Sequence, residues 1–211
     1  MTITNLSPRQ QLSAGRLPLR LTTLFLGLTL YAFAMAMMIR AQLGVDPWDV
    51  LHLGIANHLP LSLGTIIILV GILVLLAWIP LRQWPGLGTI ANTLYLGIAL
   101  DAFLRFLPEV HGLGWQILTL AAAILVNGLG GALYIGSHFG AGPRDGLMTG
   151  LHRRTGVSIR LVRTALELSV LAIGWLLGGP VGIGTMAYAL LIGPATQLFI
   201  RRASIRLPQG S

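Results

Sequence analysis

Two aspartates in matching sequence contexts are the residues whose types and spacing most readily suggest chemistry. Asp49 and Asp145 each follow a proline by two residues and a glycine by five. The two motifs are Gly44-x-x-Pro47-x-Asp49 and Gly140-x-x-Pro143-x-Asp145. Proline suits the first position of a helix, and an acidic residue in the first turn complements the helix dipole. Since glycine permits a sharp entry turn, each motif predicts the start of a short helix.

A functional interpretation of the same motifs is that the two helix starts converge on a substrate or an ion. Exposed backbone groups at the ends of broken helices form such sites in membrane transporters. Trp48 and Arg144 hold the same place in the two motifs, so one copy offers an aromatic face and the other a guanidinium group. This difference suits an asymmetric ligand, or an interface anchor on one side and a phosphate contact on the other. Asp46 is placed to cap the first of these helices.

Four polar or charged residues within apolar stretches are further candidates. An ionisable residue inside a membrane span is a functional hypothesis by default. Asp101 either serves such a site or pairs with Arg105, one helical turn further along. Arg163 and Glu167 are four residues apart, so they form either a neutralised structural pair or part of a proton or anion site. Asn92 either hydrogen-bonds between helices or belongs to the site. The candidate substrate- or ion-binding residues are thus Asp49, Asp145, Arg144, Trp48, Asp101, Arg163, Glu167 and Asn92.

Two residue types that much chemistry requires do not occur in the chain. There is no cysteine, so disulfides, thiolate metal sites and cysteine nucleophiles are excluded. All 14 basic residues are arginine, whereas a Walker-type phosphate-binding loop requires lysine. The five histidines form no zinc-binding pattern, and the chain has no nucleophile-elbow motif. We therefore expect no metal, no cofactor and no enzymatic activity.

The composition indicates a membrane protein. Of 211 residues, 55% are hydrophobic and 9% are charged, and the mean hydropathy is +0.80. Soluble domains carry about 25% charged residues. Six apolar stretches approach the roughly 20 residues that cross a bilayer. They lie near 20–39, 61–81, 87–107, 115–136, 158–178 and 183–200. The net charge of +8 does not indicate a nucleic-acid partner, because the arginines flank these stretches, where they suit lipid phosphates.

The chain contains an internal repeat at a constant offset of 96 residues. Between Gly44 and Arg105, 18 of 62 positions are identical to their counterparts, without a gap. A second doubled motif is Gly86-x-Gly88-Thr89 and Gly182-x-Gly184-Thr185. Its small residues allow close helix packing, or they leave backbone N–H groups free for an anion. A fixed period of this kind predicts two copies of one structural unit.

The distribution of arginines predicts how the two copies are oriented. With a cytoplasmic N-terminus, 11 arginines lie on the inner side and 2 on the outer side, with Arg163 inside a span. The positive-inside rule then favours six spans with both termini in the cytoplasm. Because three spans per repeat is an odd number, the second repeat is inverted relative to the first. The expected fold is an all-α polytopic membrane protein of two inverted three-helix repeats, each with a short half-helix after its first span. The expected segments are a tail over 1–19, repeat 1 over 20–107, a linker over 108–114, repeat 2 over 115–202 and a tail over 203–211.

Three segments of the chain carry a resemblance to a known family. They are Pro47-Trp48-Asp49-Val50-Leu51-His52, Pro85-Gly86-Leu87-Gly88-Thr89-Ile90-Ala91-Asn92 and Gly140-Ala141-Gly142-Pro143-Arg144-Asp145-Gly146-Leu147-Met148. Together they resemble the YczE/YyaS/YitT group of bacterial integral membrane proteins, and its YczE-like branch in particular, from about Arg20 to Arg202. The resemblance implies a multi-spanning protein of the bacterial plasma membrane, and it implies no particular activity.

Two functions fit this sequence. The doubled half-helices and the acidic residues within spans favour a small secondary transporter or exporter, with a small molecule or an ion as its substrate. The short loops and the absence of a soluble domain fit a non-transporting scaffold or accessory partner of another enzyme or export system. In either case the lipid bilayer is a partner, and a homodimer or a further membrane partner remains open.

Overall fold

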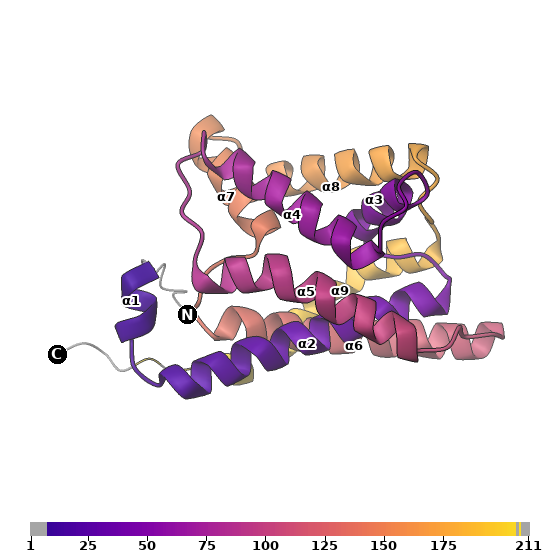
Figure 1. Cartoon of the computed structure of the whole chain (residues 1–211), viewed down its shortest axis with the longest axis horizontal. Coiled ribbons are helices and arrows are strands. Elements are labelled where there is room, and N and C mark those ends of the chain that lie inside the picture. The colour runs from indigo at the N-terminus through magenta and orange to yellow at the C-terminus, as the bar shows by residue number, and fades with distance from the viewer. Residues whose placement is uncertain (1–7, 206, 208–211) are drawn as a thin grey trace.

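The computed structural model describes residues 8–205 and 207, and every regular element in that part of the chain is a helix (Figure 1). In chain order the helices are α1 (Pro8–Ser13), α2 (Leu17–Ala41), α3 (Pro47–Ala56), α4 (Leu63–Trp78), α5 (Leu87–Phe106), α6 (Leu113–Gly136), α7 (Pro143–Thr155), α8 (Ile159–Leu176) and α9 (Ile183–Ala203). The six long helices begin and end within three residues of the six apolar stretches. α3 and α7 are the short helices that the two motifs predict, whereas α1 lies in the segment expected to be a tail.

Within the described residues, four helices are long and apolar enough to cross a bilayer: α2, α5, α6 and α9. α4 has 16 residues, and at 1.5 Å per residue its length of roughly 24 Å falls short of the ~30 Å hydrocarbon core. α8 has 18 residues but carries Arg160, Arg163 and Glu167. The expected α-helical membrane protein is therefore confirmed, while the six spans remain a prediction.

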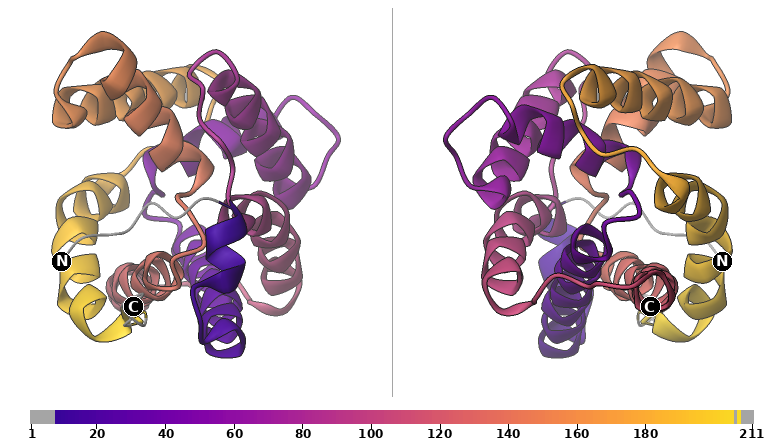
Figure 2. Two further views of the ribbon diagram at one scale, coloured as in Figure 1. Left: turned by 90° about the vertical axis from the view of Figure 1, so that its left-hand side faces the viewer. Right: turned by 90° about the vertical axis from the view of Figure 1, so that its right-hand side faces the viewer.

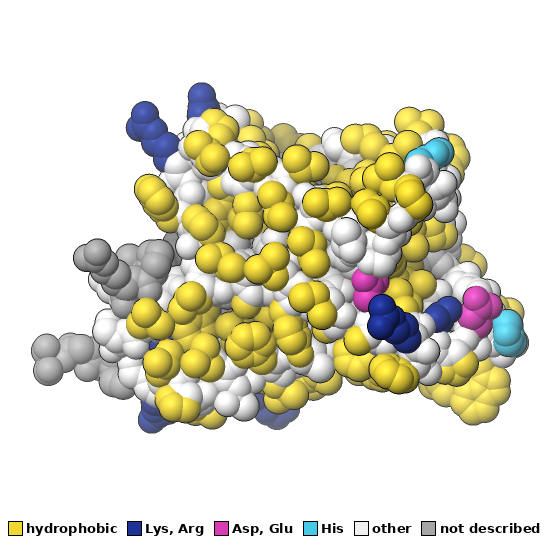
Figure 3. All heavy atoms as spheres, in the orientation of Figure 1, with side chains coloured by type: hydrophobic (Ala, Val, Ile, Leu, Met, Phe, Trp, Pro, Cys, Tyr) yellow, Lys and Arg dark blue, Asp and Glu magenta, His cyan; other side chains and the backbone are white. Residues whose placement is uncertain are grey.

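Apolar side chains cover much of the outer surface. In Figure 3 hydrophobic side chains spread over most of the visible face, and charged side chains gather mainly toward the two ends. Each of the six long helices exposes large apolar residues, such as Leu73 on α4 and Leu190 on α9. Trp84 and Trp115, near the helix ends, are also strongly exposed. Water-soluble monomers do not expose apolar surface on this scale, whereas lipid would cover it.

The six long helices surround the centre of the molecule. α2 and α6 lie on one side, α4 and α8 lie on the opposite side with the two short helices, and α5 and α9 lie between them (Figure 1 and Figure 2). α2 and α6 run antiparallel and are in intimate contact. A Cβ atom added to Gly27 would lie 2.9 Å from the carbonyl oxygen of Gly130, so small residues allow this approach.

The short helix of each half packs against a long helix of the other half. α3 packs against α8, where Gly54 and Gly174 allow close contact. α7 packs against α4, where Trp78 Nε1 donates a 3.0 Å hydrogen bond to the carbonyl oxygen of Pro143 and the Trp78 ring lies against Gly146. Contacts between residues far apart in the sequence therefore hold both short helices in place.

Two hydrogen bonds at repeat-related positions join the two halves. Gly88 N donates to the carbonyl oxygen of Phe139 at 2.8 Å, and Gly184 N donates to that of Leu43 at 2.7 Å. The glycine that follows each accepting residue has a φ of +106° or +108°, a conformation that glycine adopts without strain. The sharp entry turns expected at these glycines are thus confirmed.

The glycine-rich starts of α5 and α9 are packing motifs. Thr89 Oγ1 accepts from Gly86 N at 3.1 Å, and Thr185 Oγ1 accepts from Gly182 N at 3.3 Å. Together with the two hydrogen bonds between the halves, these pairs occupy the glycine N–H groups of both motifs. Of the two interpretations offered by the sequence, close packing therefore accounts for the motif, and an anion site there does not.

Candidate functional site

A cavity of about 380 Å³ lies between the helices. Each of the six long helices contributes residues to its lining, and so do the first turns of α3 and α7. This volume lies within the range of small-molecule sites, about 300–1,000 Å³. The two short helices that the paired motifs predict therefore meet at one cavity.

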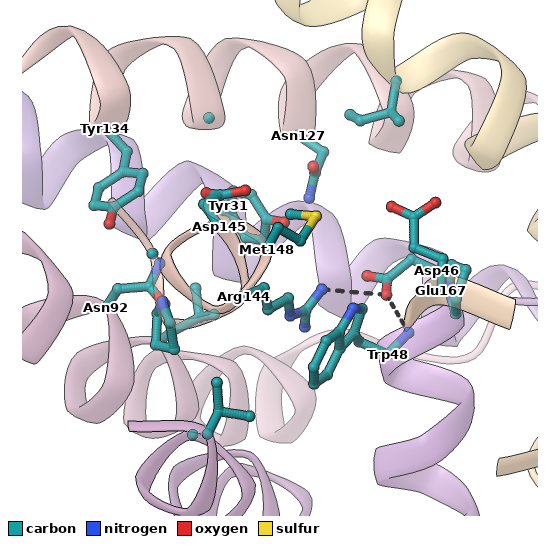
Figure 4. A pocket seen from close by; sticks show the side chains of 18 of the residues that line it. Tyr31, Asp46, Trp48, Asn92, Asn127, Tyr134, Arg144, Asp145, Met148 and Glu167 are labelled. Atoms are coloured by element: carbon teal, nitrogen blue, oxygen red, sulfur yellow. Dashed lines mark hydrogen bonds and ion pairs between the residues drawn. The ribbon is translucent and has the colours of Figure 1, made fainter. Parts of the chain in front are cut away.

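The carboxylate of Asp46 links the two short helices at this cavity. Its Oδ1 accepts hydrogen bonds from the backbone N–H groups of Trp48 at 2.8 Å and Asp49 at 3.1 Å, which caps the start of α3. The same oxygen lies 3.4 Å from Nη1 of Arg144, in the first turn of α7 (Figure 4). Asp46 is only 1% exposed, so solvent screens this ion pair little. The expected cap is confirmed, and the cap residue also pairs with the other half.

Trp48 and Arg144, which hold the same place in the two repeats, contact each other. The guanidinium carbon of Arg144 lies 4.9 Å from the centre of the Trp48 ring, a cation–π contact. Both side chains lie in the cavity beside Asp46 (Figure 4). The alternative of separate interface and phosphate anchors is therefore wrong, because both side chains line one cavity and contact each other there.

Many repeat-related positions line the cavity with unlike residues. Five such pairs are Tyr31 with Asn127, Trp48 with Arg144, Ile67 with Arg163, Gly71 with Glu167, and Asn92 with Tyr188. The ionisable residues Arg144, Arg163 and Glu167 of the second half thus correspond to uncharged residues in the first half. The backbone positions are repeated while the side-chain chemistry is not, so the cavity suits an asymmetric ligand.

Three buried polar atoms of lining residues have no hydrogen-bond partner among the described residues. They are Oδ2 of Asp46, Nδ2 of Asn127 and the hydroxyl of Tyr134. Asn127 Oδ1, by contrast, accepts a 3.2 Å hydrogen bond from the Tyr188 hydroxyl, which joins α6 to α9. A buried polar group without a partner costs about 1–3 kcal/mol. The cavity lining therefore contains unsatisfied acceptors and an unsatisfied donor.

Burial changes the protonation of the groups around the start of α3, a helix too short to span the membrane. Desolvation by burial raises the pKa of Asp46, the nearby Asp49 raises it further, and Arg144 lowers it. Burial also lowers the pKa of His52, so the 3.1 Å contact of its Nδ1 with Asp49 Oδ1 involves a neutral imidazole. Asp46 therefore exchanges a proton closer to neutral pH than an ordinary aspartate does.

Most of the candidate residues line this cavity: Trp48, Asn92, Arg144, Asp145, Arg163 and Glu167. Arg163 Nε donates to Glu167 Oε1 at 2.9 Å, so the pairing expected from their spacing is confirmed. Among the described residues no cation lies within ion-pair distance of Asp145. The structure thus leaves one cavity carboxylate without a direct counter-charge.

Asp49 is buried, but it does not line the cavity. Its side chain contacts His52 on the same helix, and Asp46 occupies the place beside Arg144. The cap residue thus lines the cavity, whereas Asp49 contacts His52, which is itself a lining residue. The repeat match between Asp49 and Asp145 therefore did not identify the two aspartates that share the cavity.

Asp101 lies outside the cavity lining altogether. Its Oδ1 accepts a 2.8 Å hydrogen bond from the backbone N–H of Gly64, in the first turn of α4. It thereby satisfies one of the backbone donors that a helix start leaves free. The predicted ion pair with Arg105 is wrong, since none forms among the described residues.

Three tyrosines line the cavity that reasoning from the sequence missed: Tyr31, Tyr134 and Tyr188. A tyrosine inside an apolar stretch resembles a packing residue, so composition alone does not mark it. The repeat offered a signal, because Tyr31 matches Asn127 and Tyr188 matches Asn92. Polar atoms at the same position of both halves indicate a shared polar surface.

The fold and the cavity define an α-helical membrane protein with a polar site between its two halves. In the described part of the chain, no cluster of His, Asp and Glu residues could hold a metal ion. The chain belongs to a family of unknown function, DUF6198, whose model matches residues 18–201.

Three known proteins are similar to this chain over most of their length. An uncharacterized protein of Haemophilus influenzae is 37% identical over 188 residues, covering 89% of this chain and 86% of the relative. The uncharacterized membrane protein YczE of Bacillus subtilis is 34% identical over 179 residues, covering 84% of this chain and 83% of the relative. The protein YyaS of the same organism is 24% identical over 179 residues, covering 83% and 89%. The family resemblance read from the motifs is thereby confirmed. No solved structure matches the chain significantly.

Proposed function

We propose that this chain is a small secondary transporter or exporter of the bacterial plasma membrane. The observation that carries this proposal is the convergence of α3 and α7, one from each repeat, on a single cavity lined by all six long helices. Short helices whose first turns meet near the middle of a membrane protein bind substrates and coupling ions in many transporters. In this proposal, Asp46 and Arg144 are the residues of the cavity lining that recognise the bound molecule.

The proposal includes six spans in two inverted repeats, with both termini in the cytoplasm. The antiparallel course of α2 and α6 supports the inversion, because these helices are repeat mates. The exchange of short helices between halves supports it too, since each contact has a repeat-related counterpart. α4 and α8 complete the spans in this arrangement, and large apolar side chains on their outward faces suit contact with lipid.

Single-cysteine labelling tests this topology without background, because the chain has no cysteine of its own. We expect Trp84→Cys and Val157→Cys to react only with reagents that enter the cytoplasm. Glu109→Cys and Val181→Cys should react with impermeant reagents added to intact cells. Labelling of Trp84→Cys and Val181→Cys from the same side would contradict the inversion, since these positions lie at nearly matching places in the two repeats.

Flux in proteoliposomes tests transport itself. We expect vesicles containing the protein to move protons in response to a substrate added from a panel of small cations, anions and neutral molecules. Proton movement equal to that of empty vesicles for every compound would count against transport. Purification of the protein with a stoichiometric partner in mild detergent would then favour the accessory role.

A further inference from the structure

The charges that line the cavity do not balance. Three carboxylates, Asp46, Asp145 and Glu167, face two guanidinium groups, Arg144 and Arg163. Arg163 and Glu167 bind each other at 2.9 Å, and Arg144 contacts Asp46 at 3.4 Å. Asp145 is left without a direct counter-charge, so the ionised cavity has an excess of one negative charge. Asp49, buried directly behind Asp46, increases this excess whenever it is ionised.

Two unpartnered atoms of the cavity lining can accept hydrogen bonds from a ligand. Oδ2 of Asp46 is buried and has no partner among the described residues. Oδ1 of the same carboxylate, in contrast, accepts from two backbone N–H groups and from Arg144. A carboxylate oxygen only accepts hydrogen bonds. The unpartnered hydroxyl of Tyr134 also lines the cavity and can accept a hydrogen bond. A ligand that carries N–H donors satisfies both atoms, and an acceptor on the same ligand satisfies the third unpartnered atom of the lining, the donor Nδ2 of Asn127.

Arg144 shows what kind of group fits between the ring and the carboxylate. Its guanidinium lies 4.9 Å from the centre of the Trp48 ring and 3.4 Å from Asp46 Oδ1. Strong charge-assisted hydrogen bonds are shorter, about 2.7–2.9 Å. Asp46 therefore holds Arg144 loosely, and a free cation with better geometry can compete with it. An anion, in contrast, would have to bind Arg144 beside the carboxylates of Asp46 and Asp145.

From these three observations we propose that the cavity is a binding site for a small monovalent organic cation, an amine or a guanidine with a short apolar stem. Its N–H groups bind Asp46 and Asp145, and its stem lies against Trp48 and the apolar lining of α4. Arg144 competes with this ligand for Asp46. The site itself follows from the cavity, whereas the role of the ligand as transported cargo rests on the proposed transport function.

Thermal unfolding of the purified full-length protein in detergent tests the binding site, with propylguanidinium, which resembles the arginine side chain, as the probe. We expect propylguanidinium to raise the melting temperature of the wild-type protein in a saturable way, and butyrate and 1-butanol to leave it unchanged. Asp46→Asn and Asp145→Asn should each weaken propylguanidinium binding about tenfold or more, since each removes a charged partner. Glu109→Gln, which changes an exposed carboxylate outside the cavity, should bind as the wild type does.

Arg144→Gln decides between a cation and an anion. If Arg144 competes with the ligand, its removal strengthens propylguanidinium binding by about tenfold, because the negative excess grows and Asp46 is released. Saturable stabilisation by butyrate that Arg144→Gln abolishes would overturn the proposal, and so would the lack of any effect of propylguanidinium on the wild type. Should Arg144→Gln not fold, the wild type and Asp145→Asn still decide the outcome.

Flux measurements in proteoliposomes distinguish a failure of the cation-binding site from a failure of the proposed transport function. Propylguanidinium that binds but does not cross proteoliposome membranes would contradict its role as cargo and leave the site intact. Protein-dependent flux of butyrate without propylguanidinium binding would overturn the cation site and leave transport standing.

Discussion

Asp46→Asn is expected to lower substrate flux about a hundredfold while the protein remains folded. Removal of one partner from a buried charged contact costs about 2–5 kcal/mol, and a hundredfold loss corresponds to about 2.7 kcal/mol. Asparagine caps helices about as well as aspartate, so the start of α3 keeps its hydrogen bonds to Trp48 and Asp49. The variant therefore removes the charge and retains the shape. Flux in proteoliposomes and thermal unfolding in detergent measure the two effects separately.

Asp101→Asn is the matched control for this prediction. Asp101 also accepts a backbone N–H at a helix start, from Gly64 of α4, but it lies outside the cavity lining. We expect its flux to equal that of the wild type. Wild-type flux in Asp46→Asn, at an unchanged melting temperature, would exclude the Asp46 carboxylate from the mechanism.

Arg20→Met is expected to lower the stability of the fold more than any substitution on the lipid-facing surface. Arg20 is 0% exposed and donates to three carbonyl oxygens: those of Gln11 at 2.6 Å, Ser137 at 3.0 Å and His138 at 3.0 Å. Its guanidinium also lies 4.3 Å from the centre of the Phe139 ring. Hydrogen bonds to charged groups contribute about 1.5–3 kcal/mol each, and methionine makes none of them.

The expected loss is at least about 3 kcal/mol, or roughly 10 °C in melting temperature. The loss arises because Arg20 ties α1 to the start of α2 and also holds the segment after α6, which is more than 100 residues away in the sequence. Arg105→Met is the matched control, since Arg105 is exposed near the end of α5. Both variants remove one positive charge, so equal melting temperatures would show that the buried hydrogen bonds of Arg20 do not stabilise the fold.

The contacts of Arg20 could not be predicted from the distribution of arginines along the chain. The arginines that flank the apolar stretches are read as lipid contacts and topology signals, and Arg20 belongs to that group. The structure instead buries Arg20 against carbonyl oxygens that end α6. A carbonyl group gives no sequence signal, because every residue has one. The charge of Arg20 still suits a topology signal, but its contacts could not be predicted.

Short-range sequence patterns correctly predicted the long helices, one ion pair and the two entry turns. The long helices follow the apolar stretches because backbone groups in lipid must be satisfied within the helix. The Arg163–Glu167 pair follows from a spacing of one helical turn. The entry turns follow from the two glycines, whose left-handed conformation other residues rarely adopt. In each case the interacting groups lie within a few residues of each other.

Contacts between distant segments were not predictable in the same way. The sequence favoured Asp49 and Asp101 as site residues, and neither lines the cavity. Which side chain of α3 faces the cavity depends on the rotation of the helix, and packing against α8 sets that rotation. Asp101 lies beside the start of α4 because α4 and α5 pack together there. Both outcomes follow from packing over several helices.

The sequence by itself determined the helical membrane class, the family and the doubling of the Gly-Pro-Asp helix starts, because composition, period and local spacing carry that information. Only the tertiary structure decided that Asp46, Trp48 and Arg144 meet in one cavity and that Asp145 lies there without a direct counter-charge. The physical reason is that electrostatic recognition depends on distances of a few ångströms between side chains. In this chain, the packing of each short helix against the opposite half sets those distances.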